Sequence, residues 1–266
     1  MITPINIGRL RGDLGDWYQL PPGHPYAHLV EATPIQCYHV ACPGRSVLVD
    51  APVYEFSLGG GSMELPGPHP PPLEAQLAAA GADPGAVTDV VITHAHFDHI
   101  NGLTKRIDGR YVPTFPTARH YLGAGDWVPA EFEDLQKFTV GVIEQHGLLT
   151  LVHGPLELAP GLDIVPAPGE TPGHQLLHMQ ATSAQAGEQD AYITGDLYHH
   201  VLEFDEPGRN VAWAEPAAMA ASKAMLTARA EASGARVYFA HIEGQWRVEA
   251  GSWRLEAGPA SGDLGL

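Results

Sequence analysis

A short run near residue 95 concentrates side chains that bind metals. Three histidines and one aspartate fall within six residues, as His94, His96, Asp98 and His99. His94 and His96 are in phase on an extended chain and can present nitrogens to one ion, whereas Asp98 and His99 lie at a turn into a helix and face a second position. A solvated histidine-rich turn is a poor alternative, because this pattern arises by chance roughly once in several hundred such sequences. The run predicts a site for two divalent ions.

Such ions take more ligands than this run supplies, so further donors must come from elsewhere in the chain. Three candidates follow predicted strands or turns: His174 after Thr-Pro-Gly, Asp196 after Gly195, and His241 after Ala240. Each by itself also suits a buried polar group satisfied by hydrogen bonds. Their common place at strand ends, where α/β folds carry their chemistry, favours one shared site.

The elements that must position these residues alternate along the chain. Residues 37–42 and 46–50 predict an antiparallel hairpin around Pro43-Gly44, and residues 54–72 predict an irregular loop. Helices are predicted over 73–80 and 217–232, and strands over 87–93, 161–165, 176–180, 191–194 and 236–240. Because both halves place polar residues after buried strands, we expect an α/β fold with two packed sheets and helices outside, an αββα sandwich. We expect residues 1–266 to form a single domain.

Composition and charge limit the classes of protein and of partner that fit this chain. Hydrophobic residues make up 44% of the chain and charged residues 17%, which is enough apolar material for a packed core. The formal net charge of −17 argues against a nucleic-acid partner. No apolar stretch is long enough to span a bilayer and the first ten residues do not resemble a signal peptide, so we expect a cytoplasmic protein without a membrane partner. Cys37 and Cys42 are expected to be buried small hydrophobes rather than a disulfide.

Taken together, the motifs resemble those of the metallo-β-lactamase-fold hydrolases. The resemblance is carried by Thr93-His94-Ala95-His96-Phe97-Asp98-His99 with Gly102, by Glu170-Thr171-Pro172-Gly173-His174, by Thr194-Gly195-Asp196 and by His241. It implies a centre of two divalent ions, zinc being expected and iron, manganese, cobalt or nickel being alternatives. It implies the following ligands: His94, His96 and His174 for the first ion, Asp98, His99 and His241 for the second, and Asp196 bridging both. Asp50 matches the family's carboxylate that supports the histidine-rich loop.

Within that family, Asp196 in a Gly-Asp context argues against the true β-lactamases, and the chain is more similar to the lactonase and methyl parathion hydrolase-like branch. The resemblance implies a hydrolase that uses a metal-bridging hydroxide on an ester or lactone, acyl-homoserine lactones included. An aryl-ester or organophosphate hydrolase is the nearest alternative. A mononuclear iron oxidoreductase similar to persulfide dioxygenases and a non-catalytic metal-stabilised binding module are the others. A small-molecule substrate and a monomer or homodimer are expected.

Two residues are candidates for catalysis beyond ligation. Asp98 is expected to pass a proton to the leaving alkoxide. His199, three residues after Asp196, stands where homoserine-lactone hydrolases have a tyrosine that supports the carbonyl oxygen; Tyr198 or His200 are the alternatives for this role. Loop aromatic residues are candidates for an apolar substrate pocket, of which two or three are expected at the site: Trp17, Tyr18, Tyr54, Phe115, Trp127, Phe132 and Phe204.

Overall fold

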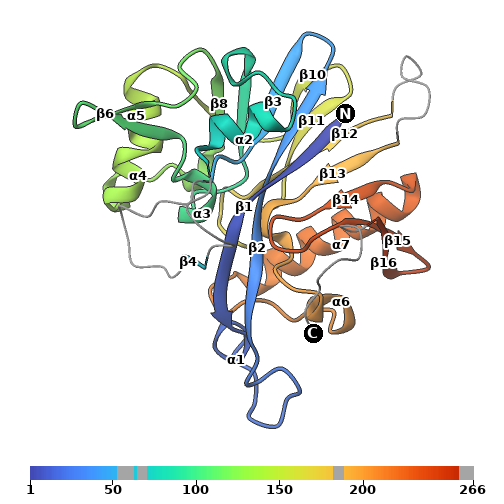
Figure 1. Ribbon diagram of the computed structural model, residues 1–266. Helices are drawn as coiled ribbons and strands as arrows, with labels where there is room; N and C mark the ends of the chain where they lie inside the picture. Colours follow the sequence, from blue (N-terminus) through green and yellow to red (C-terminus); the bar gives the residue numbers. More distant parts are fainter. Residues whose placement is uncertain (53–62, 65–70, 182–188, 258–266) are drawn as a thin grey trace.

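Two seven-stranded mixed sheets lie face to face in the computed structural model, which describes residues 1–52, 63–64, 71–181 and 189–257 (Figure 1). The first sheet has the order β4-β1-β2-β3-β5-β8-β9 and the second runs from β10 to β16 in sequence order. The first sheet consists of β1 (Ile2–Asp13), β2 (Val30–Cys42), β3 (Arg45–Val49), β4 (Met63–Glu64), β5 (Asp89–Ile92), β8 (Arg119–Gly123) and β9 (Leu149–Val152). The second consists of β10 (Leu156–Ala159), β11 (Leu162–Pro166), β12 (Gln175–Met179), β13 (Ala191–Ile193), β14 (Arg236–Tyr238), β15 (Gln245–Glu249) and β16 (Ser252–Ala257).

Helices cover the outer face of each sheet (Figure 1). The helices of the described residues are α1 (Leu14–Trp17), α2 (Leu73–Ala79), α3 (Phe97–Ile100), α4 (Asp134–Phe138), α5 (Val140–Gln145), α6 (Leu202–Asp205) and α7 (Pro216–Ser233). Of these, α2, α4 and α5 cover the first sheet and α7 covers the second. A separate hairpin pairs β6 (Thr104–Ile107) with β7 (Arg110–Pro113), and 3₁₀ turns occur at Pro84–Ala86, Ala124–Asp126, Pro129–Glu131 and Gly195–Leu197. Among the helices of the described residues, none combines the length and apolarity needed to cross a bilayer.

Three buried apolar clusters separate the layers of the sandwich. On β5, Val91 points into the cluster between the sheets, whereas Val90 and Ile92 point into the cluster under α2 and α5. On β13, Ile193 faces the cluster between the sheets and Tyr192 faces the cluster under α7. Side chains that alternate along a strand in this way leave both sheet faces buried. The predicted αββα sandwich is therefore confirmed.

Most predicted elements are present, and their boundaries lie within two residues of the predicted ones except at β2, which begins at Val30, seven residues before the predicted strand. The predicted hairpin is the antiparallel pair β2–β3, and its turn residue Gly44 has φ 73°. Helix α7 begins at Pro216 and ends before Gly234, which takes the left-handed conformation that glycine adopts without a steric penalty. The helix after His96 is a single turn of four residues. Of the predicted loop 54–72, Met63–Glu64 form β4 against β1, while most of it, Tyr54 included, lies outside the described residues.

Strand β1 has no clear signal in the sequence. Pro4 and Gly8 interrupt its apolar pattern, and both residue types are unfavourable inside a strand. The described part of β4 pairs with β1 only at Arg9 and Leu10, so Pro4 lies on a stretch where β2 is the neighbouring strand. A register shift between Asn6 and Gly8 accommodates the glycine. Cys37 is buried, as expected, whereas Cys42 is only partly buried.

Candidate metal centre

The ends of strands from both sheets bring the predicted ligands together. His94 follows β5 of the first sheet, while Asp196 follows β13 and His241 follows β14 of the second. The His241 Nε2 atom lies 3.4 Å from Asp98 Oδ2, a contact between residues 143 positions apart in the chain. The sandwich therefore assembles the site across the interface between its two sheets.

The donor atoms form two groups, each with its atoms within 4.8 Å of one another. The first group is His94, His96, Glu170 and Asp196, and the second group is Asp98, His99 and His241. Asp196 also reaches the second group, because its Oδ1 lies 3.1 Å from His99 Nε2 and 3.2 Å from His241 Nε2. Its Oδ2 lies 3.7 Å from His94 Nε2. Asp196 therefore stands between the two groups, where a bridging carboxylate is required.

Hydrogen bonds at the outer nitrogens orient two of the histidines. The Nδ1 of His99 lies 2.8 Å from Asp50 Oδ2, and that of His241 lies 2.8 Å from the carbonyl oxygen of Pro34. When Nδ1 carries the proton for such a bond, Nε2 keeps its lone pair. Both Nε2 atoms lie next to Asp196, so each ring can offer a lone pair to a cation bound there.

Asp50 connects the end of β3 to the histidine-rich loop. Its carboxylate accepts hydrogen bonds from the Thr93 backbone N–H at 2.7 Å and from the Thr93 hydroxyl at 2.9 Å, besides its contact with His99. Asp50 has φ 63°, a left-handed conformation that aspartate tolerates better than most residues. The expectation that Asp50 supports this loop is confirmed by these contacts.

Asp126 is a second supporting carboxylate, and it was not among the predicted site residues. Its Oδ2 accepts hydrogen bonds from the Ala95 N–H at 3.0 Å and the Thr171 hydroxyl at 2.8 Å, and its Oδ1 accepts from the Gly173 N–H at 2.6 Å. Asp126 thus ties the loop after β5 to the loop before β12. An Asp-Trp pair after a strand gives no sequence signal for this role.

His174 lies beside the site but belongs to neither group of donors. Its Nδ1 donates to the Ala167 carbonyl at 2.9 Å, and its Nε2 accepts from the Asp196 N–H at 3.2 Å. The close approach requires glycine at position 195, where φ is 54° and a Cβ atom would lie 2.9 Å from His174 Nε2 and 2.7 Å from Thr93 Oγ1. His174, the third ligand that the resemblance implies for the first ion, thus has its Nε2 beside the backbone of Asp196 and its ring centroid 5.2 Å from that of His94.

The buried polar atoms test whether the site suits a cation. Within the described part of the chain, the buried Oε2 atom of Glu170 has no hydrogen-bond partner, and the buried His99 Nε2 and Asp196 Oδ1 atoms lie 3.1 Å apart without forming a hydrogen bond. Buried polar atoms are rarely left unsatisfied in proteins.

Burial lowers the pKa of His94 well below its usual value, which keeps this imidazole neutral as a ligand must be. Burial raises the pKa of Asp196, but His241 and His99 outweigh it and hold that pKa well below the usual range. The donors fit divalent cations.

Comparison with known proteins agrees with this chemistry. The model of the metallo-beta-lactamase superfamily matches residues 65–247. The chain belongs to the metallo-beta-lactamase superfamily. No curated protein sequence matches the chain significantly.

Solved structures share the fold of this metallo-beta-lactamase superfamily member over nearly its whole length. A probable metal-dependent hydrolase from Staphylococcus aureus has a TM-score of 0.77 at 17% identity, covering 98% of each chain. The hydrolase AbOPH has a TM-score of 0.73 at 18% identity, covering 98% of this chain and 95% of its own. The dizinc quorum-quenching lactonase AidC has a TM-score of 0.71 at 16% identity, with the same coverage. At these identities the likeness shows the fold alone, and the superfamily is one of metal-dependent hydrolases.

Of the three neighbouring candidates for oxyanion support, His199 is the one whose side chain lies next to the donor groups. Its Nε2 lies 3.4 Å from Asp196 Oδ2 and 3.5 Å from Glu170 Oε1. Tyr198 packs instead in the apolar cluster under α7, and the Nε2 of His200 is paired with a glutamate, Glu31, at 2.8 Å. Burial lowers the pKa of His199, but the Glu170 and Asp196 carboxylates outweigh it and raise that pKa well above its usual value.

Glu203 lies on the far side of His199 and is buried. It accepts from the His199 backbone N–H at 2.9 Å, from the Tyr18 hydroxyl at 2.5 Å and from Lys223 Nζ at 2.5 Å. Burial raises the pKa of Glu203, but the hydrogen bond to His199 and the charge of Lys223 outweigh it and lower that pKa to about 2. Glu203 therefore remains ionised and holds the loop that carries His199. Glu203 was not among the predicted site residues, because two of its partners, Tyr18 and Lys223, come from distant segments.

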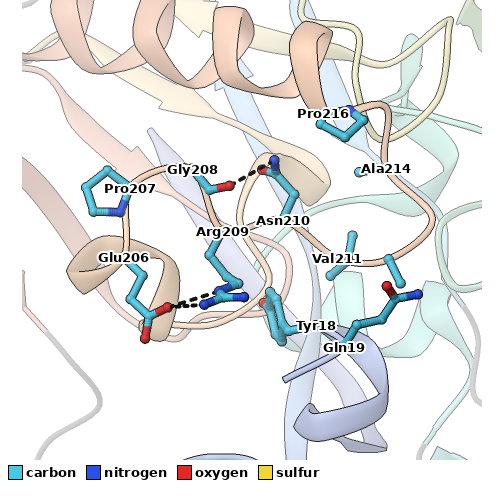
Figure 2. A pocket seen from close by; sticks show the side chains of 11 residues that line it. Tyr18, Gln19, Glu206, Pro207, Gly208, Arg209, Asn210, Val211, Ala214 and Pro216 are labelled. Carbon is cyan, nitrogen blue, oxygen red and sulfur yellow. Dashed lines mark hydrogen bonds and ion pairs between the residues drawn. The ribbon is translucent and has the colours of Figure 1, made fainter. Parts of the chain in front are cut away.

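A cavity of about 450 Å³ lies next to this support and is lined by Tyr18 and Gln19, which follow α1, by the segment between α6 and α7, and by Pro216 at the start of α7 (Figure 2). Tyr18 lines it, and Glu206 and Arg209 form an ion pair at 2.7 Å on its wall. None of the lining residues belongs to the donor groups. Tyr18, which lines the cavity and donates to Glu203, connects the cavity wall to the support of His199.

The candidate aromatic residues divide between the site and the core. Trp17 lies against Trp213, whose indole N–H donates to Glu170 Oε1 at 2.6 Å. Three others lie in or against the apolar cluster under α2 and α5: Phe115, Trp127 and Phe132. Phe204 packs in the cluster under α7. Trp213, 48% exposed, was not among the candidates, because nothing in its local sequence places it near Glu170.

Proposed function

We propose that this chain is a dinuclear metal-dependent hydrolase of carboxylic esters or lactones. The observation that carries the proposal is Asp196, one carboxylate in reach of two groups of donors that come from both sheets. His94, His96 and His174 would hold one ion with Asp196. Asp98, His99 and His241 would hold the other with the same aspartate. A mononuclear site would leave one buried group of charged and polar donors without a cation.

The residues around the groups suit hydrolysis. Two divalent ions in such a site supply Lewis acidity and lower the pKa of water toward neutrality. Asp98 can take a proton from the attacking water and give it to the leaving alkoxide. In the net reaction the water oxygen bonds to the carbonyl carbon, the bond to the alkoxide oxygen breaks, and an acid and an alcohol result. His199 can donate a hydrogen bond to the oxyanion that develops on the carbonyl oxygen.

Trp213 supports a substrate with an apolar group. Its ring makes edge contacts with His199 at 5.8 Å and with Trp17 at 6.2 Å between centroids, while nearly half of its surface remains exposed. An exposed tryptophan beside charged groups offers a surface for an acyl or aryl chain. Several structures of the same fold are lactonases, one of them with N-hexanoyl-L-homoserine bound at the catalytic metal centre. These observations favour lactones with an acyl side chain as the first substrates to test.

The test combines metal analysis with a substrate panel. Protein purified without chelator is analysed for metal, and N-acyl homoserine lactones, aryl esters and phosphotriesters are offered to it and to Asp196→Asn. We expect two ions per chain, hydrolysis of lactones or esters, and loss of both second-ion binding and hydrolysis in the variant. One ion per chain in a fully active enzyme, or activity confined to phosphotriesters, contradicts the proposal.

A further inference from the structure

We infer that Lys223 of α7 is a positioning residue that holds His199 and Trp213 in place relative to each other. This role rests on the proposed function, in which His199 meets the developing oxyanion and Trp213 meets the apolar part of the substrate. The two side chains belong to different segments: His199 precedes α6, and Trp213 lies in residues 206–215, between α6 and α7. Lys223 contacts the supports of both.

The ammonium group of Lys223 is buried and has three acceptors. Its Nζ donates to Glu203 Oε2 at 2.5 Å, to the Arg209 carbonyl at 3.0 Å and to Asn210 Oδ1 at 2.8 Å. An ammonium group carries three N–H donors, so each of them has a partner. A lysine is almost never buried unless its charge is paired, and here the paired charge is that of Glu203.

The first acceptor connects Lys223 to His199. Through its Oε1, Glu203 also accepts the His199 backbone N–H at 2.9 Å and the Tyr18 hydroxyl at 2.5 Å. Lys223 Nζ lies 4.8 Å from the centroid of the Tyr198 ring, within the range in which a cation and an aromatic face attract. A buried carboxylate that loses its cation is strongly destabilising. Glu203 can therefore anchor the His199 backbone only while Lys223 faces it.

The other two acceptors connect Lys223 to the segment that carries Trp213. They lie at positions 209 and 210, and two residues further on the Ala212 N–H donates to the Trp17 carbonyl at 2.7 Å. Residues 206–212 border the cavity, so no close packing fixes them on that side (Figure 2). The place of Trp213 therefore depends on these few anchors, of which Lys223 supplies two.

His199 and Trp213 meet where the two segments come together. Their ring centroids lie 5.8 Å apart and their planes are perpendicular, an edge contact that aromatic rings favour. One such contact between two loops cannot fix both of them, so its geometry depends on the anchors behind each ring. Lys223 therefore determines how far the donor for the carbonyl oxygen lies from the surface for the apolar chain.

Kinetics of Lys223→Met test this role, because methionine keeps the length of the side chain and removes its charge. The substrates are N-acyl homoserine lactones and esters of increasing chain length. We expect both metals to be retained and kcat to fall by roughly 10–100-fold, since displacing a catalytic group by about 1 Å can cost 10²-fold. KM should lose its dependence on chain length, as in Trp213→Ala. Lys105→Met, which removes the same charge from a surface pair with Glu74, should keep wild-type kcat and KM.

Double variants distinguish positioning from a general loss of stability. In a His199→Ala background, Lys223→Met should lower kcat by less than about twofold more, because the group it positions is already absent. Glu203→Gln combined with Lys223→Met leaves no unpaired charge and keeps an oxygen for the His199 N–H. It should recover kcat but not the dependence of KM on chain length. This pair also provides a folded protein if circular dichroism shows that Lys223→Met alone is unfolded.

The indole N–H resonance of Trp213 tests the second connection without any substrate. It is assigned by its loss in Trp213→Phe, and it should shift in the Glu203→Gln and Lys223→Met double variant but not in Lys105→Met. Three results overturn the inference: wild-type kinetics in Lys223→Met, an equal loss of kcat with and without His199, or an unchanged indole resonance. A wild type that hydrolyses no member of the panel contradicts the proposed function instead, and the indole resonance then still decides whether Lys223 holds Trp213.

Discussion

Asp126 provides the sharpest test of how the metal centre is held together. Its carboxylate accepts from Ala95 on the loop after β5 and from Thr171 and Gly173 on the loop before β12. Replacing it with alanine removes three hydrogen bonds at once and separates the two loops. We expect Asp126→Ala to lower both the stability of the metal-free protein and its affinity for metal.

The magnitude follows from the contacts. A hydrogen bond to a charged acceptor contributes about 1.5–3 kcal/mol when buried. Because the Asp126 side chain is partly exposed and water can replace part of each bond, we assign about 1 kcal/mol to each, or about 3 kcal/mol in all. For a protein of this size that loss lowers Tm by roughly 6–12 °C. Loss of such outer support lowers metal affinity by roughly 10–100-fold.

The assay is chemical unfolding of the chelator-treated protein, followed by metal titration. Asp126→Asn serves as an intermediate, because its amide oxygen can replace only one carboxylate oxygen while its NH₂ faces another donor. It should lose roughly half as much stability. Asp83→Ala removes an aspartate that accepts only from a nearby backbone N–H, that of Gly85, and should leave metal affinity unchanged. If Asp126→Ala unfolds at the same denaturant concentration as wild type and binds metal equally well, the loops are held by other contacts and the reasoning is wrong.

Three further perturbations give separate outcomes. Asp98→Asn should leave the fold intact but reduce turnover by more than the 10²–10⁴-fold typical of general acid–base catalysis, because the variant also loses a metal ligand. Near-normal turnover would show that Asp98 has no part in the mechanism. His199→Ala should lower kcat/KM for esters by roughly 10²–10³-fold with both metals retained. His199→Tyr should restore activity on lactones more than activity on phosphotriesters. If kcat/KM of His199→Ala stays within about threefold of wild type on all substrates, His199 is a packing residue. Burial lowers the pKa of His120 from 6.5 to about 4, so the unfolded chain binds a proton in that range that the folded chain does not. As pH decreases from 6.5 to 4, the free energy of unfolding should therefore fall by roughly 3 kcal/mol more in wild type than in His120→Leu. Urea titrations at several pH values measure this difference. If the free energy of unfolding changes equally with pH in both proteins, the prediction is wrong.

Local patterns in the sequence predicted much of the fold and the chemical class of the site. The Pro43-Gly44 hairpin turn and the proline and glycine at the two ends of α7 act through their own backbone preferences, so they could be identified without tertiary information. The histidine-rich run and the strand-end positions of Asp196 and His241 likewise indicated a metal centre, because the types of the donor residues and their spacing are read directly from the sequence. Strand β1 lacked such a signal, since its partners compensate for Pro4 and Gly8.

Tertiary packing decided which side chains face the site. Glu170 and His174 share one turn, and nothing in their spacing indicates which of them points toward His96; that depends on Trp213 and on the backbone of Asp196, which come from distant segments. Asp126 acquires its role only when two loops meet around it. His199 faces the donor groups because Glu203 holds its backbone and the apolar cluster takes the ring of its neighbour. Sequence spacing determines the phase of a residue along its own segment, whereas contact between segments depends on how the two sheets pack.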